Sequence, residues 1–229
     1  MSRGKKYLEA AKRRTPGEPV SLEQAVELVK AMAFAKFDET VEIAIHLNLK
    51  GKHTVRDTLV LPHSFRAEKK ILVFAKGDKA EEARACGAAY VGEADLIEKI
   101  QGGWLDFDIA VATPDMMKDV GKLGPVLGRR GLMPNPKTKT VTFDIKGAVE
   151  ELKKGRVEFK ADKTGVVHLA IGKISMDKEK ITENALLLIQ EVIRKRPADL
   201  KGEYLSSIAL SSTMGPGVRV NAKDKFQRE

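Results

Sequence analysis

The side chains that most often carry out catalysis or hold metal ions are scattered in this chain. None of the four histidines, His46, His53, His63 and His168, forms an HxxxH pair or has a cysteine partner. Zinc sites use such residues at short, regular spacings. The single cysteine, Cys86, lies in the helical pattern ARACGA, where a packed thiol is typical. We therefore expect no metal, no cofactor and no catalytic activity.

The phosphate-binding motifs of nucleotide enzymes are also missing. The apolar run ILVFAKG is followed by DKAEEA and not by the GxGxxG turn of dinucleotide-binding proteins. Gly121-Lys122 is followed by leucine, and no glycine stands at position 116, so the spacing of a P-loop fails. A nucleotide-dependent enzyme stays an alternative because the middle of the chain has a βαβ pattern.

A basic stretch rich in glycine and proline offers contact with anions. Lys118–Lys139 holds six Lys or Arg residues and one Asp. Glycine lets backbone N–H groups approach a ligand, and basic side chains attract phosphate. Arg129, Arg130 and Lys137 are the candidate contacts. A phosphate-facing loop and an ordinary solvated loop both agree with this composition.

Two other stretches suit contact with RNA. Lys36-Phe37 lies between a predicted helix and a predicted strand, where a ring can stack on a base while the cation meets a phosphate. A core phenylalanine that closes the corner is the alternative. SSTMGPGVR, residues 211–219, carries one charge and no catalytic residue type. Its glycines and small side chains would let RNA approach the backbone.

The N-terminal part predicts helix followed by antiparallel strands. Residues 1–14 are strongly basic and predict an arm or a frayed helix. Ser21 and Gln24 form a capping box before an amphipathic helix. Apolar residues alternate over 41–49, as in a strand with one buried face, and Thr58–Leu61 predicts a second strand.

The C-terminal part has the same style. Two strands flank a turn at Asp162–Gly165, and Asp177 is predicted to cap a long amphipathic helix that ends before Pro197. A strand at Tyr204–Leu210 and a short one at Val218–Val220 complete the pattern.

The middle of the chain differs from both ends. Strand, helix, strand, helix and strand follow one another, which predicts an α/β fold with a parallel sheet covered by helices. We expect a discontinuous α+β domain, residues 1–66 plus 156–229, and an inserted Rossmann-like α/β domain, residues 67–155. Their two links would permit hinge motion. A single domain is the alternative.

Composition and charge agree with a soluble RNA-binding protein. No apolar run approaches the roughly 18–20 residues that span a membrane. One cysteine excludes an intrachain disulfide and fits a reducing cytoplasm. The net charge is +9, from 41 Lys and Arg against 32 Asp and Glu, which suggests a polyanionic partner.

Five stretches occur here in the order of one known family: AKFDETVEI, DFDIAVATPDMM, GRRGLMPNPK, RVEFKADKTGVVH and SSTMGPGVR. Through them nearly the whole chain resembles the bacterial form of large-subunit ribosomal protein one, the protein of the mobile stalk beside the tRNA exit site. The resemblance implies two domains, the first built from both chain ends and the second inserted.

The resemblance also implies partners and site residues. The family's first domain binds large-subunit ribosomal RNA and a similar element of its own messenger RNA, which represses translation, and the stalk helps exit-site tRNA to move and leave. A free monomer in the cytoplasm is implied. Asp162, Lys163 and Thr164 are weaker candidates in the same domain. The RNA-binding residues carried over by motif are Lys36, Phe37, Thr40, Glu42, Ser211, Thr213, Met214 and Gly215.

Two departures limit what carries over. The usual family loop has a proline where Arg129 stands here, and Pro125 occupies a position that is often basic. After Leu61-Pro62-His63 the chain continues with SFRAEKK in place of glycines and a lysine. We therefore predict a non-enzymatic ribosomal protein that recognises the shape of an RNA, with a non-ribosomal RNA chaperone or regulator as the alternative.

Overall fold

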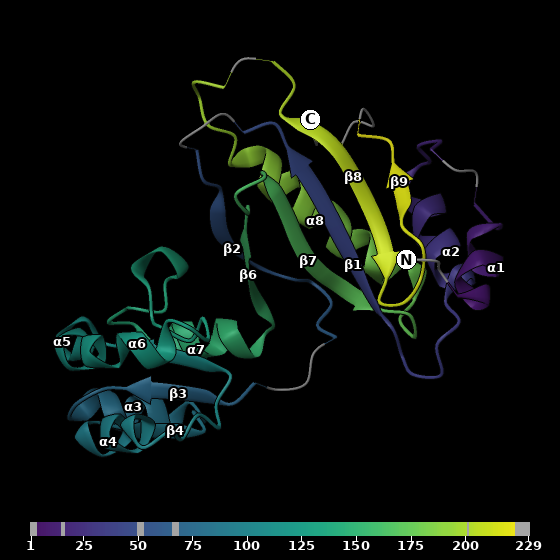
Figure 1. The fold of residues 1–229 in the computed structure, drawn as a ribbon. Coiled ribbons are helices and arrows are strands. Elements are labelled where there is room, and N and C mark those ends of the chain that lie inside the picture. The colour runs from purple at the N-terminus through teal and green to yellow at the C-terminus, as the bar shows by residue number, and fades with distance from the viewer. Residues whose placement is uncertain (1–3, 15–16, 50–52, 66–68, 201, 223–229) are drawn as a thin grey trace. The chain divides into compact units, whose positions relative to one another are not determined.

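The computed structural model describes residues 4–14, 17–49, 53–65, 69–200 and 202–222. Contacts along the chain divide it into two compact units. Unit 1 comprises Met1–Phe65 and Glu158–Glu229, and unit 2 comprises Arg66–Val157. In Figure 1 the two chain ends, purple and yellow, therefore belong to the same unit.

Unit 1 is built on a four-stranded antiparallel sheet in the order β7-β1-β8-β9. The alternation of apolar residues in β1 buries Val41, Ile43, Ile45 and Leu47 on one face, as predicted, and leaves Glu42 on the other. The strands are β1 (Thr40–Leu47), β7 (Val166–Lys173), β8 (Leu205–Ser212) and β9 (Val218–Val220).

Two helices, α2 (Leu22–Met32) and α8 (Lys178–Arg194), cover one face of this sheet (Figure 1). The predicted capping box of α2 is confirmed. Asp177 occupies the N-cap position of α8, but its side chain makes no capping hydrogen bond and pairs with Lys180 at 2.7 Å. The short helix α1 (Lys5–Ala11) precedes α2. The opposite face of the sheet carries no helix among the described residues.

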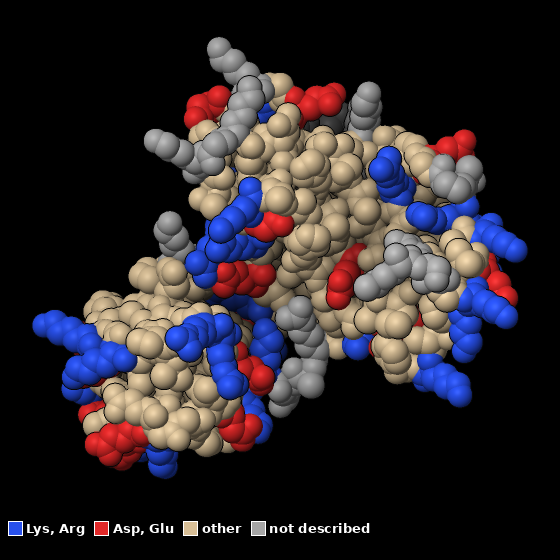
Figure 2. All heavy atoms as spheres, in the orientation of Figure 1, with Lys and Arg blue, Asp and Glu red and all other residues tan. Residues whose placement is uncertain are grey.

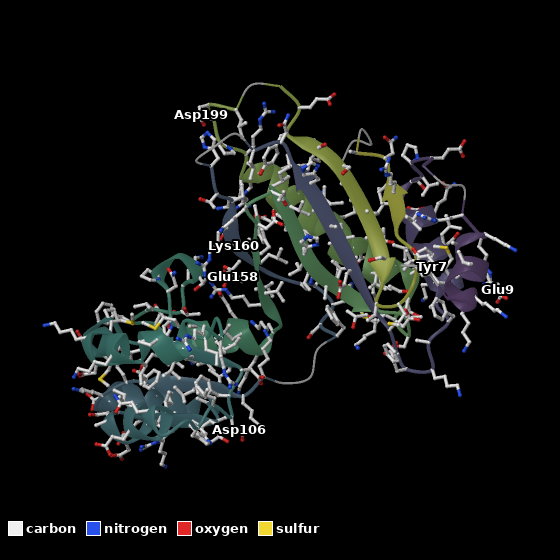
Figure 3. The ribbon with its side chains drawn as sticks, in the orientation of Figure 1. Tyr7, Glu9, Asp106, Glu158, Lys160 and Asp199 are labelled. Atoms are coloured by element: carbon white, nitrogen blue, oxygen red, sulfur yellow. The ribbon has the colours of Figure 1, made fainter. Side chains whose placement is uncertain are left out.

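The strands on either side of the turn at residues 162–165 pair with different partners. β6 (Arg156–Lys160) pairs with β2 (Arg56–Val60), whereas β7 pairs with β1. Glu158 and Lys160 of β6 are labelled in Figure 3, and Glu158 accepts a hydrogen bond from Arg56 of β2. Across the turn itself Ala161 forms an antiparallel bridge with Val167, so the turn closes a short hairpin and also leads from one sheet to the other.

Unit 2 contains a three-stranded parallel sheet in the order β4-β3-β5, which confirms the predicted α/β fold class. All of β3 is buried, because α4, α5 and α6 cover one face and α3 and α7 cover the other. The elements are β3 (Ile71–Phe74), α3 (Asp78–Ala85), β4 (Tyr90–Gly92), α4 (Ala94–Gln101), β5 (Ile109–Ala112), α5 (Met117–Val120), α6 (Gly124–Leu127) and α7 (Ile145–Lys153), with 3-10 turns at Pro114–Met116, Gly121–Leu123 and Pro136–Thr138.

The glycine-rich stretch after β5 differs from its prediction. Short helical segments run from Pro114 to Leu127 and bury apolar side chains such as Leu123. The N–H of Gly128 donates to the carbonyl of Gly124 at 2.8 Å and so continues the helical pattern. Pro125 lies in the first turn of α6, where proline fits. Residues 118–127 are therefore short helical segments, and the prediction of a loop is wrong for them.

Candidate nucleic-acid interface

Two segments from opposite ends of the chain meet at one end of the unit 1 sheet. The first is the corner between α2 and β1, residues 33–40, and the second is the turn between β8 and β9, residues 213–217. Thr213 joins them, because its Oγ1 accepts the N–H of Thr40 at 3.0 Å and donates to the carbonyl of Thr40 at 3.3 Å. The Thr213 hydroxyl is therefore committed within the protein, with one lone pair left for an RNA donor.

The carboxylate of Glu39 organises this junction from inside. The residue is 1% exposed. Its Oε1 accepts the N–H groups of Phe34 at 3.1 Å and Ala35 at 2.9 Å, and its Oε2 accepts the N–H of Met214 at 3.0 Å. Charge-assisted bonds of this kind are stronger than neutral ones. One buried side chain therefore ties the corner to the turn.

Ser212 extends the same network into the turn. Its hydroxyl donates to the Glu39 carboxylate and accepts the N–H of Gly215 at 3.2 Å. Burial by itself raises the pKa of Glu39, but the hydrogen bonds from Ser212, Ala35, Met214 and Phe34 together hold the pKa below its usual value. Glu39 is therefore a buried anion held by donors.

The corner is also anchored on the side of β7. The N–H of Ser175 donates to the Asp38 carboxylate at 3.1 Å, the Ser175 hydroxyl donates to the same carboxylate at 2.8 Å, and the N–H of Ile174 donates to the carbonyl of Glu39 at 2.9 Å. These bonds fix the backbone on both sides of Lys36-Phe37. The corner can therefore present its side chains in a defined direction.

Two large apolar side chains project from this rigid frame. Phe37 is 56% exposed and Met214 is 52% exposed. The alternative that Phe37 is a core residue is therefore wrong. Lys36 beside it is also exposed, and Thr40 is half-buried. An exposed ring next to a cation, on a backbone held by several hydrogen bonds, can stack on a base at a small entropic cost.

The uncovered face of the sheet continues this surface with small residues. Glu42 lies between Ala170 and Ser211 in the strand register, and Ala44 lies beside Ala209. In Figure 2, which views this face, the area over β1 and β8 is mostly without Lys or Arg, and basic side chains gather where α1 lies in Figure 1. A ligand on this face would contact few charged side chains, so its recognition there would depend mainly on its shape.

The structure separates the weaker candidates from this junction. The Asp162–Thr164 turn precedes β7 and lies at the far end of β1, roughly 20 Å away at about 3.4 Å per residue. The Asp162 carboxylate accepts both the hydroxyl of Thr164, at 2.7 Å, and the N–H of Val166, at 2.8 Å, and these bonds lower its pKa. The Lys163 side chain is exposed, and among the described residues it takes no part in these hydrogen bonds of the turn.

The basic candidates from the stretch Lys118–Lys139 belong to unit 2. Arg129 and Arg130 follow α6 and are exposed. The side chain of Lys137 lies outside the described residues. The structure thus brings together the candidates of the corner and the turn, and leaves these three on a different unit.

Sequence reasoning missed Glu39 and Ser212. In the string AKFDET, Glu39 resembles any surface acid, and no spacing rule marks it as buried. Ser212 was one hydroxyl among several small residues. The strand alternation gives a partial signal, because it places Ser212 on the buried face of β8.

Neither a metal site nor a membrane span is found in the part of the chain that the structure describes. No group of three or more His, Cys, Asp or Glu side chains is placed to hold a metal ion there. No helix within it is long and apolar enough to cross a bilayer.

Comparison with known proteins places the chain in a family. The model of the ribosomal protein L1p/L10e family matches residues 29–216. A protein of Treponema denticola named large ribosomal subunit protein uL1 is 61% identical over 97% of this chain and 99% of its own length. The proteins of the same name from Borreliella burgdorferi strain B31 and Borreliella afzelii are 60% and 61% identical over 96% and 95% of this chain, and over 97% and 96% of their own lengths. The chain therefore belongs to the ribosomal protein L1p/L10e family, whose members are structural proteins and not enzymes.

Proposed function

We propose that this protein is a constituent of the large ribosomal subunit in the cytoplasm, and that it binds the ribosomal RNA of the stalk through unit 1. The observation that carries the proposal is the junction of corner and turn. There, Phe37 and Met214 project from a backbone that a buried carboxylate holds in place. The names and the family of the relatives support the ribosomal assignment.

Recognition of RNA shape explains why the surface has so little charge. Bases that are splayed out of a helix can stack on an aromatic ring, and ribose and phosphate oxygens can bond to backbone and hydroxyl groups. The interface would consist of Lys36, Phe37, Thr40, Glu42, Ser211, Thr213, Met214 and Gly215. We place it in a domain formed by residues 1–66 and 156–229, with residues 67–155 as an inserted domain.

Two finer roles rest on the family resemblance. The same surface would bind an element of the protein's own messenger RNA with a similar shape, and so repress translation. On the ribosome, the protein would help exit-site tRNA to move and leave. For the first role, the messenger element should compete with the ribosomal fragment, and Phe37→Ala should weaken both complexes by similar factors.

A filter-binding comparison tests the ribosomal assignment. The full chain is titrated with a fragment of stalk ribosomal RNA and with unrelated hairpins of equal length. We expect at least a tenfold preference for the stalk fragment. Equal affinity for all RNAs would contradict the proposal and favour a general RNA chaperone.

A further inference from the structure

A hollow lined by three arginines lies at the β9 edge of unit 1. Its volume is about 330 Å³, and its lining includes Arg13, Arg14, Glu18, Val218 and Arg219. The three guanidinium groups outnumber the one carboxylate among these residues. Such a hollow suits an anion, because a guanidinium presents several N–H donors in a fixed plane.

Two of the arginines are anchored by the elements of the candidate interface. Arg13 donates to the carbonyl of Ala31, one of the last carbonyls of α2, which have no partner within the helix. Arg14 donates to the carbonyl of Gly217, in the turn that also carries Met214. Each bond uses one nitrogen of its guanidinium and leaves other donors. The hollow is therefore tied by Arg14 to the turn of the candidate interface and by Arg13 to the end of α2.

The third arginine connects the hollow with the uncovered sheet face. Arg219 pairs with Ala209 in the register of β9 and β8, so its side chain lies on the same face as Ala209 and is exposed. In addition, the Nε of Arg14 is buried and has no acceptor among the described residues. The three arginines thus lie beside the uncovered face of the sheet, which has few charged side chains. Some of their N–H donors have no acceptor among the described residues.

We propose that this arginine hollow, lined by Arg13, Arg14 and Arg219, binds a phosphodiester group of the RNA that lies on the candidate interface. The proposal rests on the proposed function. The turn and the corner would recognise the shape of the RNA, and the hollow would supply a charge-assisted contact to its backbone at the edge of the same surface. Arg14 would act on the turn as well, because its bond to Gly217 holds that backbone.

The salt dependence of RNA binding tests this assignment. The affinity of the full chain for the stalk fragment is measured at several KCl concentrations for the native protein and for Arg13→Gln/Arg219→Gln. Each lost phosphate contact lowers the slope of log K against log salt by about one. Because the hollow would hold one phosphodiester group, we expect the double variant to lose about one from the slope. Arg14 stays unchanged, so that the turn is not disturbed.

Two control variants distinguish a local contact with phosphate from a general effect of positive charge on RNA binding. Lys180→Gln/Arg194→Gln removes the same charge from exposed sites on α8, which covers the other face of the sheet, and should keep the native slope. Arg13→Lys/Arg219→Lys keeps the charge and should keep the slope, with weaker binding because the planar donors are lost. Melting curves confirm that each variant is folded.

Two results would overturn the proposal. The first is an unchanged slope in Arg13→Gln/Arg219→Gln, and the second is an equal loss of slope in the α8 control. If the slope is unchanged and inorganic phosphate raises the Tm of the native protein, the hollow takes free phosphate and not RNA. If the native protein does not prefer the stalk fragment to unrelated hairpins, the proposed function fails instead, and the slopes still report on the hollow.

Discussion

At the scale of single residues, Glu39 is the centre of the candidate interface although it faces no ligand. Its carboxylate is buried among N–H and O–H donors from the corner and the turn. The residues that project, Phe37 and Met214, depend on it for their direction. The sequence indicated that the ring of Phe37 could be exposed and stack on a base. It gave no sign that Glu39 is buried, because that burial arises only when the two chain ends meet.

Replacing this carboxylate should change the pH dependence of stability. The folded pKa of Glu39 lies below its usual value of 4.5, so its contribution is present above that pH and is lost as pH falls through the folded pKa. Glu39→Gln should lower the unfolding free energy by roughly 1–3 kcal/mol at pH 7. Denaturant titrations should show this gap narrowing below about pH 4.5.

Glu42→Gln is the matched control, because Glu42 is an exposed glutamate three residues further on, in β1. It should change stability little at any pH. A gap between the native protein and Glu39→Gln that stays constant down to pH 3 would show that the Glu39 carboxylate does not contribute in this way.

Thr213 has an internal role that the sequence did not reveal. Thr213→Val leaves the N–H and carbonyl of Thr40 without their partner, so it should lower the unfolding free energy by about 1 kcal/mol and weaken RNA binding through the displaced turn. Thr213→Ser keeps the hydroxyl and should preserve both. Native stability and affinity in Thr213→Val, measured by denaturation and filter binding, would refute this role.

At the scale of elements, the turn between β8 and β9 is shaped by close contacts that exclude larger side chains. A Cβ at Gly215 would lie 2.4 Å from the Oγ of Ser212, the hydroxyl that links Gly215 to Glu39. A Cβ at Gly217 would meet only the carbonyl of Leu210, at 3.8 Å. The two glycines look alike in the sequence, and only the packing of the turn distinguishes them.

This difference predicts opposite outcomes for two similar substitutions. Gly215→Ala should weaken binding of the stalk fragment by roughly 1–3 kcal/mol, because the displaced Ser212 hydroxyl leaves buried groups unpaired. Gly217→Ala should bind nearly as the native protein does. The affinities of both variants are measured side by side, and equal effects would show that the Ser212 contact is unimportant.

The limits of prediction at this scale follow from periodicity. Strand β1 and helix α8 were predictable because their apolar residues repeat at two and at about 3.6 residues. The helical segments between Pro114 and Leu127 were missed because glycine and proline disfavour helices in isolation, and burial of Leu123 and its neighbours overrides that preference. The different partners of β6 and β7 depend on tertiary pairing, which local patterns do not contain.

At the scale of the whole molecule, both chain ends build one unit, and the middle builds another. The described candidates on unit 2, Arg129 and Arg130, are exposed basic residues, whereas the corner and the turn belong to unit 1. We therefore expect RNA recognition to reside in unit 1, and substitutions on unit 2 to affect it little. Few residues of the interface are basic, so the salt dependence of binding should be modest for a protein of net charge +9.

The affinities of two variants for the stalk fragment show which unit carries the RNA-binding surface. Phe37→Ala should weaken binding by about 1–3 kcal/mol, or roughly 5- to 150-fold, with an unchanged Tm, because the exposed ring contributes to stacking and not to the core. Arg129→Gln/Arg130→Gln should bind within about twofold of the native protein. Native affinity in Phe37→Ala together with a large loss in Arg129→Gln/Arg130→Gln would contradict the account and move the RNA-binding surface to unit 2.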